Sequence, residues 1–284
     1  MSRGMLGTPV REALEGAITA IGAAGCESPR LDAELLLANV LGVSRERLMT
    51  DRELTVEGPA VRAFQDAVRR RSIEREPVAY ILGQRGFRRI ELTTDPRALV
   101  PRPETELLVE VGLRLPQGAQ VLDLCTGSGA VALALKEERP DLVVTGSDIS
   151  EEALELAREN GRRLGLEVRW LRSDLLSEIP DDFDAILANP PYVAEADRRT
   201  LAPEIMRHEP HGALFAGPEG LDVIRRLIEQ AAGRTRLRMV ALEVGAGQGE
   251  EVAELLREAG FDGVAVERDL AGIERVARGE RPPR

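Results

Sequence analysis

The sequence predicts an α/β protein in which a mostly parallel sheet, covered by helices on both faces, follows a small helical bundle. Two observations lead to this fold class. From about residue 104 onward, apolar strand-like segments alternate with helical patterns, and such alternation is typical of parallel sheets. Residues from about 8 to 76 instead carry apolar side chains at helical spacing, as at Val10, Leu14, Ile18 and Ile21.

This change of pattern predicts how the chain is divided. We expect a helical domain over residues 1–76, a linker with a short hairpin over 77–103, and the sheet domain over 104–284. Within the linker, residues 80–83 and 87–92 predict short strands or a hairpin. Residues 100–104 must be extended, because a residue that precedes proline disfavours the helical conformation.

The sheet domain contains five strand candidates, at residues 120–124, 143–148, 168–171, 184–188 and 239–244, and helical patterns such as 151–164 and 250–259. Ser150 fits the N-cap of the first of these helices, and Glu151 and Glu152 favour its positive first turn. Parallel sheets bind ligands beyond the carboxyl ends of their strands. We therefore expect the functional residues directly after each strand.

A glycine-rich loop follows the first strand candidate. It spans residues 125–130, and its glycines permit a tight turn that a ligand can approach closely. Asp148 ends the second strand about twenty residues further on, where a carboxylate can accept hydrogen bonds from both hydroxyls of a ribose. The loop and Asp148 predict an adenosine-type cofactor and leave open whether it is S-adenosylmethionine or a nicotinamide dinucleotide.

Two further loops are less specific. Ser173 and Asp174 follow the third strand; with S-adenosylmethionine the acid would face the adenine amino group, and the alternative is a helix cap. Residues 245–249 also lie between a strand and a helix, but no acid follows at the required distance within a βαβ unit. We interpret this second glycine-rich segment as a flexible turn.

The tetrapeptide Asn189-Pro190-Pro191-Tyr192 closes the fourth strand. Consecutive prolines make a rigid exit with few N–H donors, so carbonyl oxygens remain available to a ligand. The Asn189 side-chain oxygen and the Pro190 carbonyl can each accept one N–H of a planar nitrogen, and Tyr192 can stack on a flat substrate. Such a clamp can aim the delocalised lone pair of an amide-type nitrogen at a methyl donor. A nicotinamide enzyme has no use for it, so the tetrapeptide favours S-adenosylmethionine.

Composition narrows the class of partner. The formal net charge is −11, whereas nucleic-acid binders usually carry a basic excess. Cys26 and Cys125 lie in different predicted domains, and His208 and His211 could form at most a partial site, so we expect neither a disulfide framework nor a bound metal. We see no membrane-spanning run and no secretory signal, and we expect a cytoplasmic protein without membrane association.

These motifs resemble those of the class I S-adenosylmethionine-dependent methyltransferases and, within them, the release-factor glutamine N5-methyltransferases. The resemblance covers nearly the whole chain and is carried by residues 75–83, residues 100–106, the loop around Gly127 and the tetrapeptide. It implies a seven-stranded sheet with a helical N-terminal domain that recognises the substrate. It also implies that the substrate is the glutamine in the Gly-Gly-Gln loop of class 1 peptide chain release factors.

The same resemblance assigns roles to individual residues. The catalytic residues would be Asn189, Pro190 and Tyr192. The substrate would contact Asn189, Pro190, Pro191, Tyr192, Phe87 and Arg102. The cofactor would contact Asp123, Cys125, Thr126, Gly127, Ser128, Gly129, Asp148, Ser173, Asp174, Leu175 and Asn189. Cys125 stands where the class often has glycine, and we reject it as a nucleophile because no histidine lies nearby in sequence to activate it. Arg102 and Glu104 could bind a ligand or only fix the domain junction.

One alternative substrate stays open. The tetrapeptide also occurs in DNA-adenine and RNA-guanine methyltransferases, so the clamp could hold adenine N6 or guanine N2. The acidic charge argues against a direct nucleic-acid partner, whereas a continuous basic channel at the mouth of the site would favour one. A non-catalytic adaptor would have a damaged loop or tetrapeptide, and both are intact.

Overall fold

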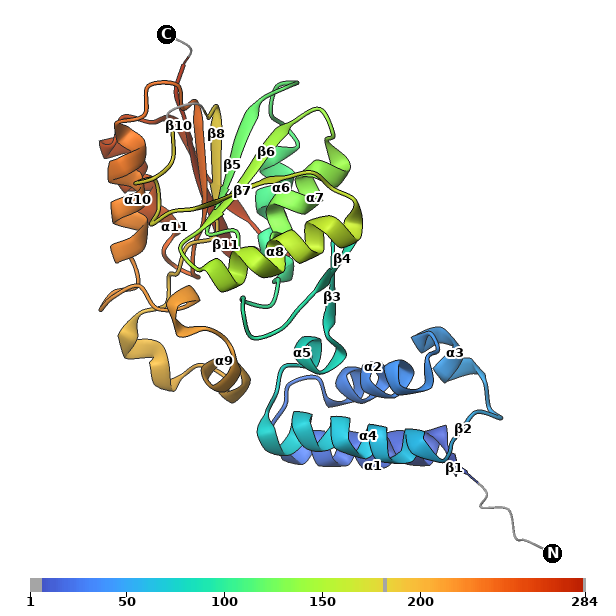
Figure 1. Cartoon of the computed structure of the whole chain (residues 1–284). Helices are drawn as coiled ribbons and strands as arrows, with labels where there is room; N and C mark the ends of the chain where they lie inside the picture. Colours follow the sequence, from blue (N-terminus) through green and yellow to red (C-terminus); the bar gives the residue numbers. More distant parts are fainter. Residues whose placement is uncertain (1–6, 181–182, 283–284) are drawn as a thin grey trace, which may run out of the picture. The chain divides into compact units, whose positions relative to one another are not determined.

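The computed structural model describes residues 7–180 and 183–282, and the chain divides into two compact units (Figure 1). The helical unit comprises the chain up to Gly83 together with Ala202–His208. The sheet unit comprises Gln84–Leu201 and Glu209–Arg284. The chain therefore crosses from one unit to the other after Gly83, Leu201 and His208.

The helical unit contains α1 (Val10–Ala23), α2 (Pro29–Leu41), α3 (Arg45–Thr50), α4 (Pro59–Arg69), a π-helical turn (Arg70–Glu74), α5 (Val78–Leu82) and α9 (Pro203–His208). Strand β1 (Thr8–Pro9) pairs with β2 (Thr55–Val56). Proline occupies the first turn of α2 and α4, where its missing N–H costs nothing, and Gly42 ends α2 in the left-handed conformation. The helices enclose a core that includes Ile21, Leu36, Leu37 and Phe64.

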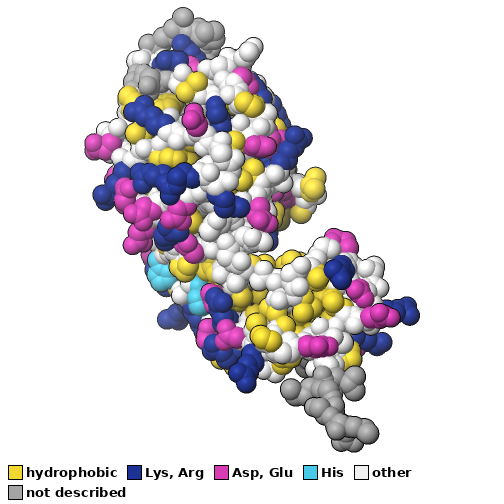
Figure 2. Space-filling model, turned by 45° about the vertical axis from the view of Figure 1, so that its right-hand side comes forward, with side chains coloured by type: hydrophobic (Ala, Val, Ile, Leu, Met, Phe, Trp, Pro, Cys, Tyr) yellow, Lys and Arg dark blue, Asp and Glu magenta, His cyan; other side chains and the backbone are white. Residues whose placement is uncertain are grey.

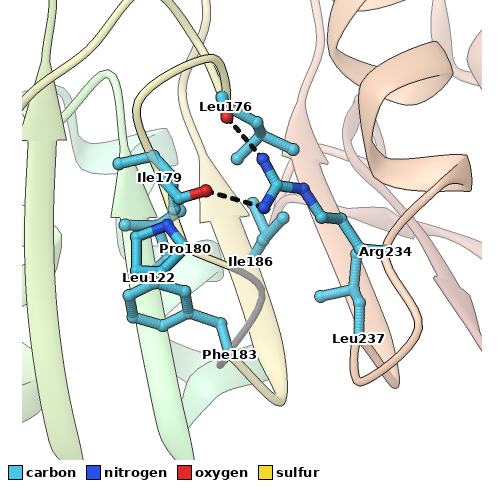
Figure 3. A pocket seen from close by; sticks show the side chains of 8 residues that line it. All are labelled: Leu122, Leu176, Ile179, Pro180, Phe183, Ile186, Arg234 and Leu237. Carbon is cyan, nitrogen blue, oxygen red and sulfur yellow. Dashed lines mark hydrogen bonds between the residues drawn. The ribbon is translucent and has the colours of Figure 1, made fainter.

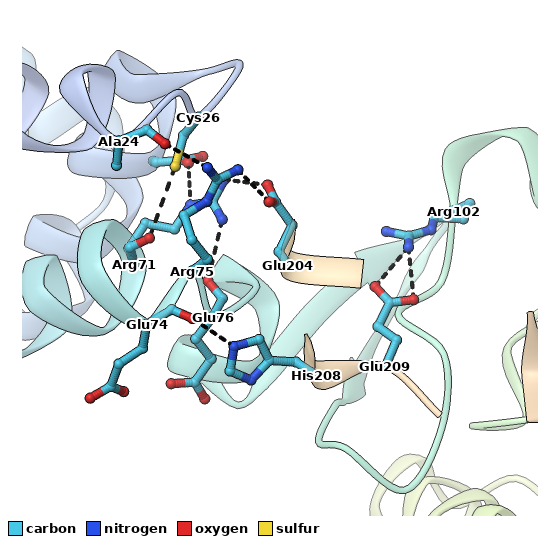
Figure 4. A network of polar contacts seen from close by, with 11 residues as sticks. Ala24, Cys26, Arg71, Glu74, Arg75, Glu76, Arg102, Glu204, His208 and Glu209 are labelled. Atoms are coloured by element: carbon cyan, nitrogen blue, oxygen red, sulfur yellow. Dashed lines mark hydrogen bonds and ion pairs between the residues drawn. The ribbon is translucent and has the colours of Figure 1, made fainter. Parts of the chain in front are cut away.

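Buried ion pairs fasten α9 into the helical unit (Figure 4). Arg71, with 8% of its side chain exposed, donates to Asp32 at 2.7 Å and to Glu204 of α9 at 3.1 Å. Arg75 also donates to Glu204, and it donates to the carbonyl of Ala24 at 2.5 Å. Pairing of this kind compensates each buried charge, so removal of one partner leaves a charge that is costly to bury.

The sheet unit is built on a mixed sheet with helices on both faces (Figure 1). Within the described residues, seven strands form the order β10-β11-β9-β8-β5-β6-β7. They are β5 (Gln120–Leu124), β6 (Val143–Asp148), β7 (Arg169–Arg172), β8 (Ala185–Ala188), β9 (Met239–Glu243), β10 (Asp262–Arg268) and β11 (Glu274–Glu280). Strands β5 to β9 pair in parallel, and β11 is antiparallel to both of its neighbours.

The helices of this unit are α6 (Glu106–Gly112), α7 (Ala130–Glu138), α8 (Glu151–Leu164), α10 (Asp222–Ala232) and α11 (Gly249–Glu258). Single-turn 3-10 helices span Pro103–Thr105, Glu195–Arg199 and His211–Ala213. Successive residues of a strand point to opposite faces, so Val121 joins the core under α6 and α7 whereas Leu122 joins the core under α10 and α11. The sheet is therefore buried on both sides, as its apolar strands predict.

The predicted strands agree closely with the observed ones, and the seven-stranded architecture implied by the resemblance is confirmed. Strands β10 and β11 were not among the strand candidates. Their sequences are rich in charged residues, and most of their side chains are only half-buried or exposed, so they lack the apolar run of a central strand.

The linker differs from its prediction in one segment. Residues 80–83 were expected to form a strand or hairpin, but they belong to the short helix α5 and its cap. Pro77 precedes this helix in an extended conformation, and Gly83 ends it with a φ of 71°. The hairpin follows as β3 (Gln84–Phe87) paired with β4 (Ile90–Thr93).

Arg234 closes the loop that follows β7 in the sheet unit (Figure 3). Its guanidinium donates to the carbonyls of Ile179, at 2.7 Å, and of Leu176. The cavity beneath it measures about 10 Å³ and is lined mainly by apolar residues such as Leu122 and Phe183. A space of this size holds one water molecule at most, so this cavity is a packing defect and not a ligand site. No helix of the described residues is long and apolar enough to cross a membrane.

Candidate active site

A cavity of the sheet unit lies beyond the carboxyl ends of β5, β6 and β8 and has a volume of about 280 Å³. Ligands of parallel sheets bind at this edge. The predicted site residues that line the cavity are Asp123, Cys125, Thr126, Gly127, Ser128, Asp148, Asn189, Pro191 and Arg102. Segments far apart in the sequence, at residues 97–105, 123–131, 148–153 and 210–213, thus meet around one space.

The loop after β5 turns sharply through left-handed backbone conformations. Gly127 has a φ of 55° and Gly129 a φ of 84°. Cys125 adopts the same left-handed region with a φ of 58°, although it is not a glycine, so the backbone keeps this conformation where the class often has glycine. The loop is held by the N–H of Thr126, which donates to the Ser147 carbonyl at 2.9 Å. These angles leave room for a ligand to approach the backbone.

Two carboxylates organise the floor of the cavity. Asp123 accepts hydrogen bonds from the Thr126 hydroxyl and, at 3.0 Å, from the N–H of Ala132, and burial raises its pKa to about 7. Asp148 accepts from the N–H of Gly127 and of Ser150, each at 2.9 Å, and burial raises its pKa as well. A third backbone N–H, that of Ile149, also acts on this carboxylate. A carboxylate has about four acceptor sites, so capacity remains for a ribose hydroxyl.

The Cys125 thiol is held neutral. Burial raises its pKa well above the ordinary value, and the nearby carboxylates of Asp148 and Asp123 add to the effect. A nucleophilic cysteine needs a lowered pKa. The structure therefore supports the rejection of Cys125 as a nucleophile.

The tetrapeptide leaves the sheet at the rim of the cavity. Pairing of β8 with β5 and with β9 ends at Ala188, so the groups of Asn189 and Pro190 lie beyond the ladder. Asn189 and Pro191 line the cavity, whereas Pro190 is buried. The Asn189 amide donates to the Thr105 hydroxyl at 3.2 Å. Its side-chain oxygen is thereby the end of the amide that is left to a substrate.

Tyr192 is fixed at both ends. Its hydroxyl donates to Oε1 of Glu243 at 3.3 Å, and burial beside this carboxyl raises its pKa. Its carbonyl accepts from the side chain of Gln248 at 3.0 Å, and Gln248 in turn accepts from the N–H of Gly245 at 2.8 Å. The segment 245–249, interpreted as a flexible turn, thus supports the tetrapeptide through Gln248.

Arg102 lines the cavity and forms an ion pair within the sheet unit (Figure 4). It donates to both oxygens of Glu209, at 2.7 and 2.8 Å, and only 1% of the Glu209 side chain is exposed. This pair fixes the segment that places Pro210 and Gly212 on the cavity wall. Glu104 lies 3.6 Å from Arg275 and is not among the residues that line the cavity.

Seven predicted site residues are not among those that line the cavity: Phe87, Gly129, Ser173, Asp174, Leu175, Pro190 and Tyr192. Phe87 is 2% exposed within the core, so its surroundings give no support to the predicted contact with a substrate. Asp174 forms an ion pair with Arg226 at 2.8 Å on the surface. Ser173 accepts from the N–H of Glu178 at 3.0 Å, and Leu175 is buried. Local turn geometry therefore accounts for Ser173, as its alternative interpretation allowed.

Three supporting residues were missed: Thr105, Gln248 and Glu243. Thr105 lies inside the 100–106 segment that carries the resemblance, and Gln248 inside the second glycine-rich segment. Glu243 gives a sequence signal of its own, because an acid ends an otherwise apolar central strand. It is 1% exposed, and burial raises its pKa to about 7.

Comparisons with known proteins agree with this geometry. The family models of the methyltransferase small domain and of the PrmC N-terminal domain match residues 103–231 and 12–83. The release factor glutamine methyltransferase of Deinococcus radiodurans is 40% identical over 276 residues, which cover 96% of this chain and 98% of that protein. That of Rhodospirillum rubrum is 41% identical over 271 residues, covering 92% and 83%. A methyltransferase structure from Pyrococcus furiosus shares the fold, with a TM-score of 0.52, 20% identity, and coverage of 68% of this chain and 89% of that one.

The sheet order, the glycine-rich loop after β5 and the acid after β6 define a class I methyltransferase, a class that uses S-adenosylmethionine. The sequence identity to these relatives, over nearly the whole chain, identifies the family within this class. The chain belongs to the release factor glutamine methyltransferases.

Proposed function

We propose that this protein transfers a methyl group from S-adenosylmethionine to the side-chain amide nitrogen of the glutamine in the Gly-Gly-Gln loop of class 1 peptide chain release factors. One observation carries the proposal. Asn189 follows the buried strand β8 at the rim of the cavity, and Thr105 accepts a hydrogen bond from its NH₂ group, so that its oxygen is left to accept an N–H bond. This arrangement suits a planar nitrogen with two hydrogens, and the family membership makes that nitrogen a glutamine amide.

The residues around the cavity fit the cofactor. The hydroxyl of Ser128 is buried on the cavity wall and has no hydrogen-bond partner among the described residues, so it is available to a polar ligand. The Asp148 carboxylate suits the ribose hydroxyls, and the loop at Cys125–Gly129 would lie along the ligand. When bound, S-adenosylmethionine supplies an electrophilic methyl group. For Ser173, Asp174 and Leu175 the surroundings described above give no such support.

The clamp acts by position and electrostatics. The Asn189 oxygen and the Pro190 carbonyl would each accept one hydrogen of the glutamine amide, which aims its lone pair at the methyl group. Tyr192, held by Glu243 and Gln248, would pack against the flat amide. Once methylated, the nitrogen becomes acidic and releases a proton to water, so no strong protein base is required.

We assign substrate recognition to the helical unit. Figure 2 shows a patch of hydrophobic side chains on this unit, with acidic and basic side chains around it. Leu31, Met49 and Ile73 of the unit are exposed large apolar residues, with Ile73 at 71%. Exposed apolar surface of this kind is typical of protein-binding faces. Acidic and basic side chains are interspersed over the face in view, which favours a protein partner over a nucleic acid. We place the reaction in the cytoplasm, where release factors act.

The decisive experiment incubates the full chain with methyl-labelled S-adenosylmethionine and a class 1 release factor. A release factor with its loop glutamine changed to alanine serves as the matched control. We expect label on the first protein and none on the second. Label on both, or on neither, would contradict the proposal, and label on added DNA or ribosomal RNA instead would establish the alternative substrate.

A further inference from the structure

Asn160 is a buried residue of α8 that ties together two segments far apart in the sequence. It is 0% exposed. Its side-chain oxygen accepts from the N–H of Thr93 at 2.7 Å, and its NH₂ group donates to the carbonyls of Thr93, at 3.1 Å, and of Ser128, at 3.0 Å. Backbone groups have fixed donor and acceptor roles, so these partners allow only one orientation of the amide. Asn160 therefore joins the end of β4 to the glycine-rich loop after β5.

Both of these segments lead into walls of the cavity. Ser128 belongs to the loop that lines it, and its buried hydroxyl has no hydrogen-bond partner among the described residues. Thr93 ends β4 and precedes residues 97–102, a cavity-lining segment that we call the strap. A Cβ placed on Gly127 would lie 3.9 Å from the Cβ of Ala98, so the loop and the strap come close together there. The separation of the two segments therefore sets the width of the cavity at this point.

The strap is fastened to the same helix. Arg97 donates to both oxygens of Glu159, at 3.1 and 2.7 Å. Ala98 packs with Leu156 in a buried cluster. Residues four apart in a helix lie on one face, so Leu156 and Asn160 belong to the same buried face of α8. This helix is thereby a common support for the loop and the strap, and Asn160 bonds both to the loop and to the strand that leads into the strap.

We propose that Asn160 is a positioning residue that holds the glycine-rich loop and the strap at the separation that S-adenosylmethionine requires. It acts through the backbone of Ser128 and of Thr93, and it does not itself line the cavity. The inference rests on the proposed function for the identity of the cofactor. It is independent of the methyl-accepting group, so it can be tested by cofactor binding without a release factor.

A purely structural role for Asn160 predicts different behaviour. Its loss would leave backbone groups of Thr93 and Ser128 unpaired and would lower stability in either case, but the folded protein would keep its affinity for the cofactor. Gln230→Ala is the matched control. The Gln230 side chain accepts from the N–H of Leu176 at 2.8 Å, and neither residue is among those that line the cavity. The control thus removes a bond from a side-chain amide to the backbone at a place remote from the cofactor loop.

The test measures the Kd of S-adenosylmethionine by calorimetry and the thermal unfolding of each full-length variant. We expect Asn160→Ala to raise the Kd on the order of tenfold, about the contribution of one hydrogen bond. Asn160→Asp keeps an acceptor for Thr93 and loses the N–H donors, so it should raise the Kd as well because Ser128 is released. Gln230→Ala should lower stability and leave the Kd unchanged. A Kd within about threefold of the wild type in either Asn160 variant, or an equal rise in Gln230→Ala, would overturn the positioning role.

A second measurement needs no variant and decides the question even if the Asn160 variants fail to fold. Hydrogen exchange of the wild type is compared with and without saturating S-adenosylmethionine. A ligand that requires the Asn160 contacts suppresses the local opening that breaks them, so exchange of the Thr93 N–H should slow, whereas that of Leu176 should not. Unchanged exchange at Thr93 would overturn the role of Asn160 alone. Failure of the wild type to bind S-adenosylmethionine would overturn the proposed function, and this role with it.

Discussion

Gly146 is a position where one added methyl group should weaken both the fold and the cofactor loop. Gly146 lies in β6, opposite Trp170 of β7. A Cβ placed on it would lie 2.3 and 2.5 Å from two carbons of the Trp170 ring and 3.0 Å from the Thr126 hydroxyl. Ordinary contact begins at 3.4 Å, so the ring would have to move by about 1 Å. Overpacking of this kind typically costs about 1–3 kcal/mol.

The displaced ring would also disturb the cofactor loop. Trp170 packs so closely against Gly129 that a Cβ there would lie 2.9 Å from the ring, and the Thr126 hydroxyl donates to Asp123. We therefore expect Gly146→Ala to lower the free energy of unfolding by about 1–3 kcal/mol and to weaken S-adenosylmethionine binding.

The assay for Gly146→Ala is urea unfolding followed by the fluorescence of Trp170, the one tryptophan of the sequence. Gly233→Ala is the matched control, because this glycine has a φ of −76° and the nearest atom, the Gln230 carbonyl oxygen, would lie 3.8 Å from the new Cβ. It should be neutral or stabilising by about 0.4–1 kcal/mol. If Gly146→Ala unfolded within about 0.5 kcal/mol of the wild type, the close packing of Trp170 would be refuted.

Three further predictions concern single side chains. Asn189→Ala should abolish most methyl transfer while the Kd of S-adenosylmethionine, measured by calorimetry, changes little; an equal loss of both would mean that Asn189 serves the cofactor. Asp32→Ala should destabilise the helical unit by about 3 kcal/mol, because it removes one of the carboxylates that pair with the buried Arg71. Glu15→Ala removes an exposed ion pair and should leave the free energy of unfolding unchanged, with urea unfolding of both variants followed by circular dichroism. Burial raises the pKa of Glu243 from 4.5 to about 7, so its folded state favours the protonated form, and the stability present below pH 4.5 is lost as the pH rises to about 7. Glu243→Gln should therefore flatten the pH dependence of unfolding over this range, and an unchanged slope would contradict the raised pKa.

Local patterns predicted much of the fold, because buried parallel strands and amphipathic helices leave a direct trace in the sequence. The bounds of β5, β6 and α8 agree with the expected ones to the residue. The edge strands β10 and β11 could not be read in the same way, since their charged side chains hide the alternation. Residues 80–82 carry apolar side chains that suit a strand as well as a helix. They form a helix because Pro77 at the N-cap and Gly83 at the C-cap favour a helical start and end there.

The surroundings of the side chains distinguish site residues that the resemblance had treated alike. Phe87 and Asp174 stand near the functional motifs in sequence, yet the core encloses the first and an ion pair holds the second at the surface. A linear motif carries no information on the direction of a side chain. Conversely, Thr105 and Glu243 are more than a hundred residues apart in the chain, yet Thr105 contacts Asn189 and Glu243 contacts Tyr192 of the same tetrapeptide.

The central parallel strands, the cofactor loop, Asp148 and the Asn189 tetrapeptide could all be predicted from the sequence, because each depends on residues close together in the chain and on a strand that ends there. The surroundings of these residues became known from the tertiary fold. It joined Arg102 to Glu209 and Tyr192 to Glu243, and it left Oε2 of Glu243 buried without a hydrogen-bond partner among the described residues. Such contacts join residues that are far apart in the chain and come together only when the connections between strands are in place, so no local sequence pattern encodes them.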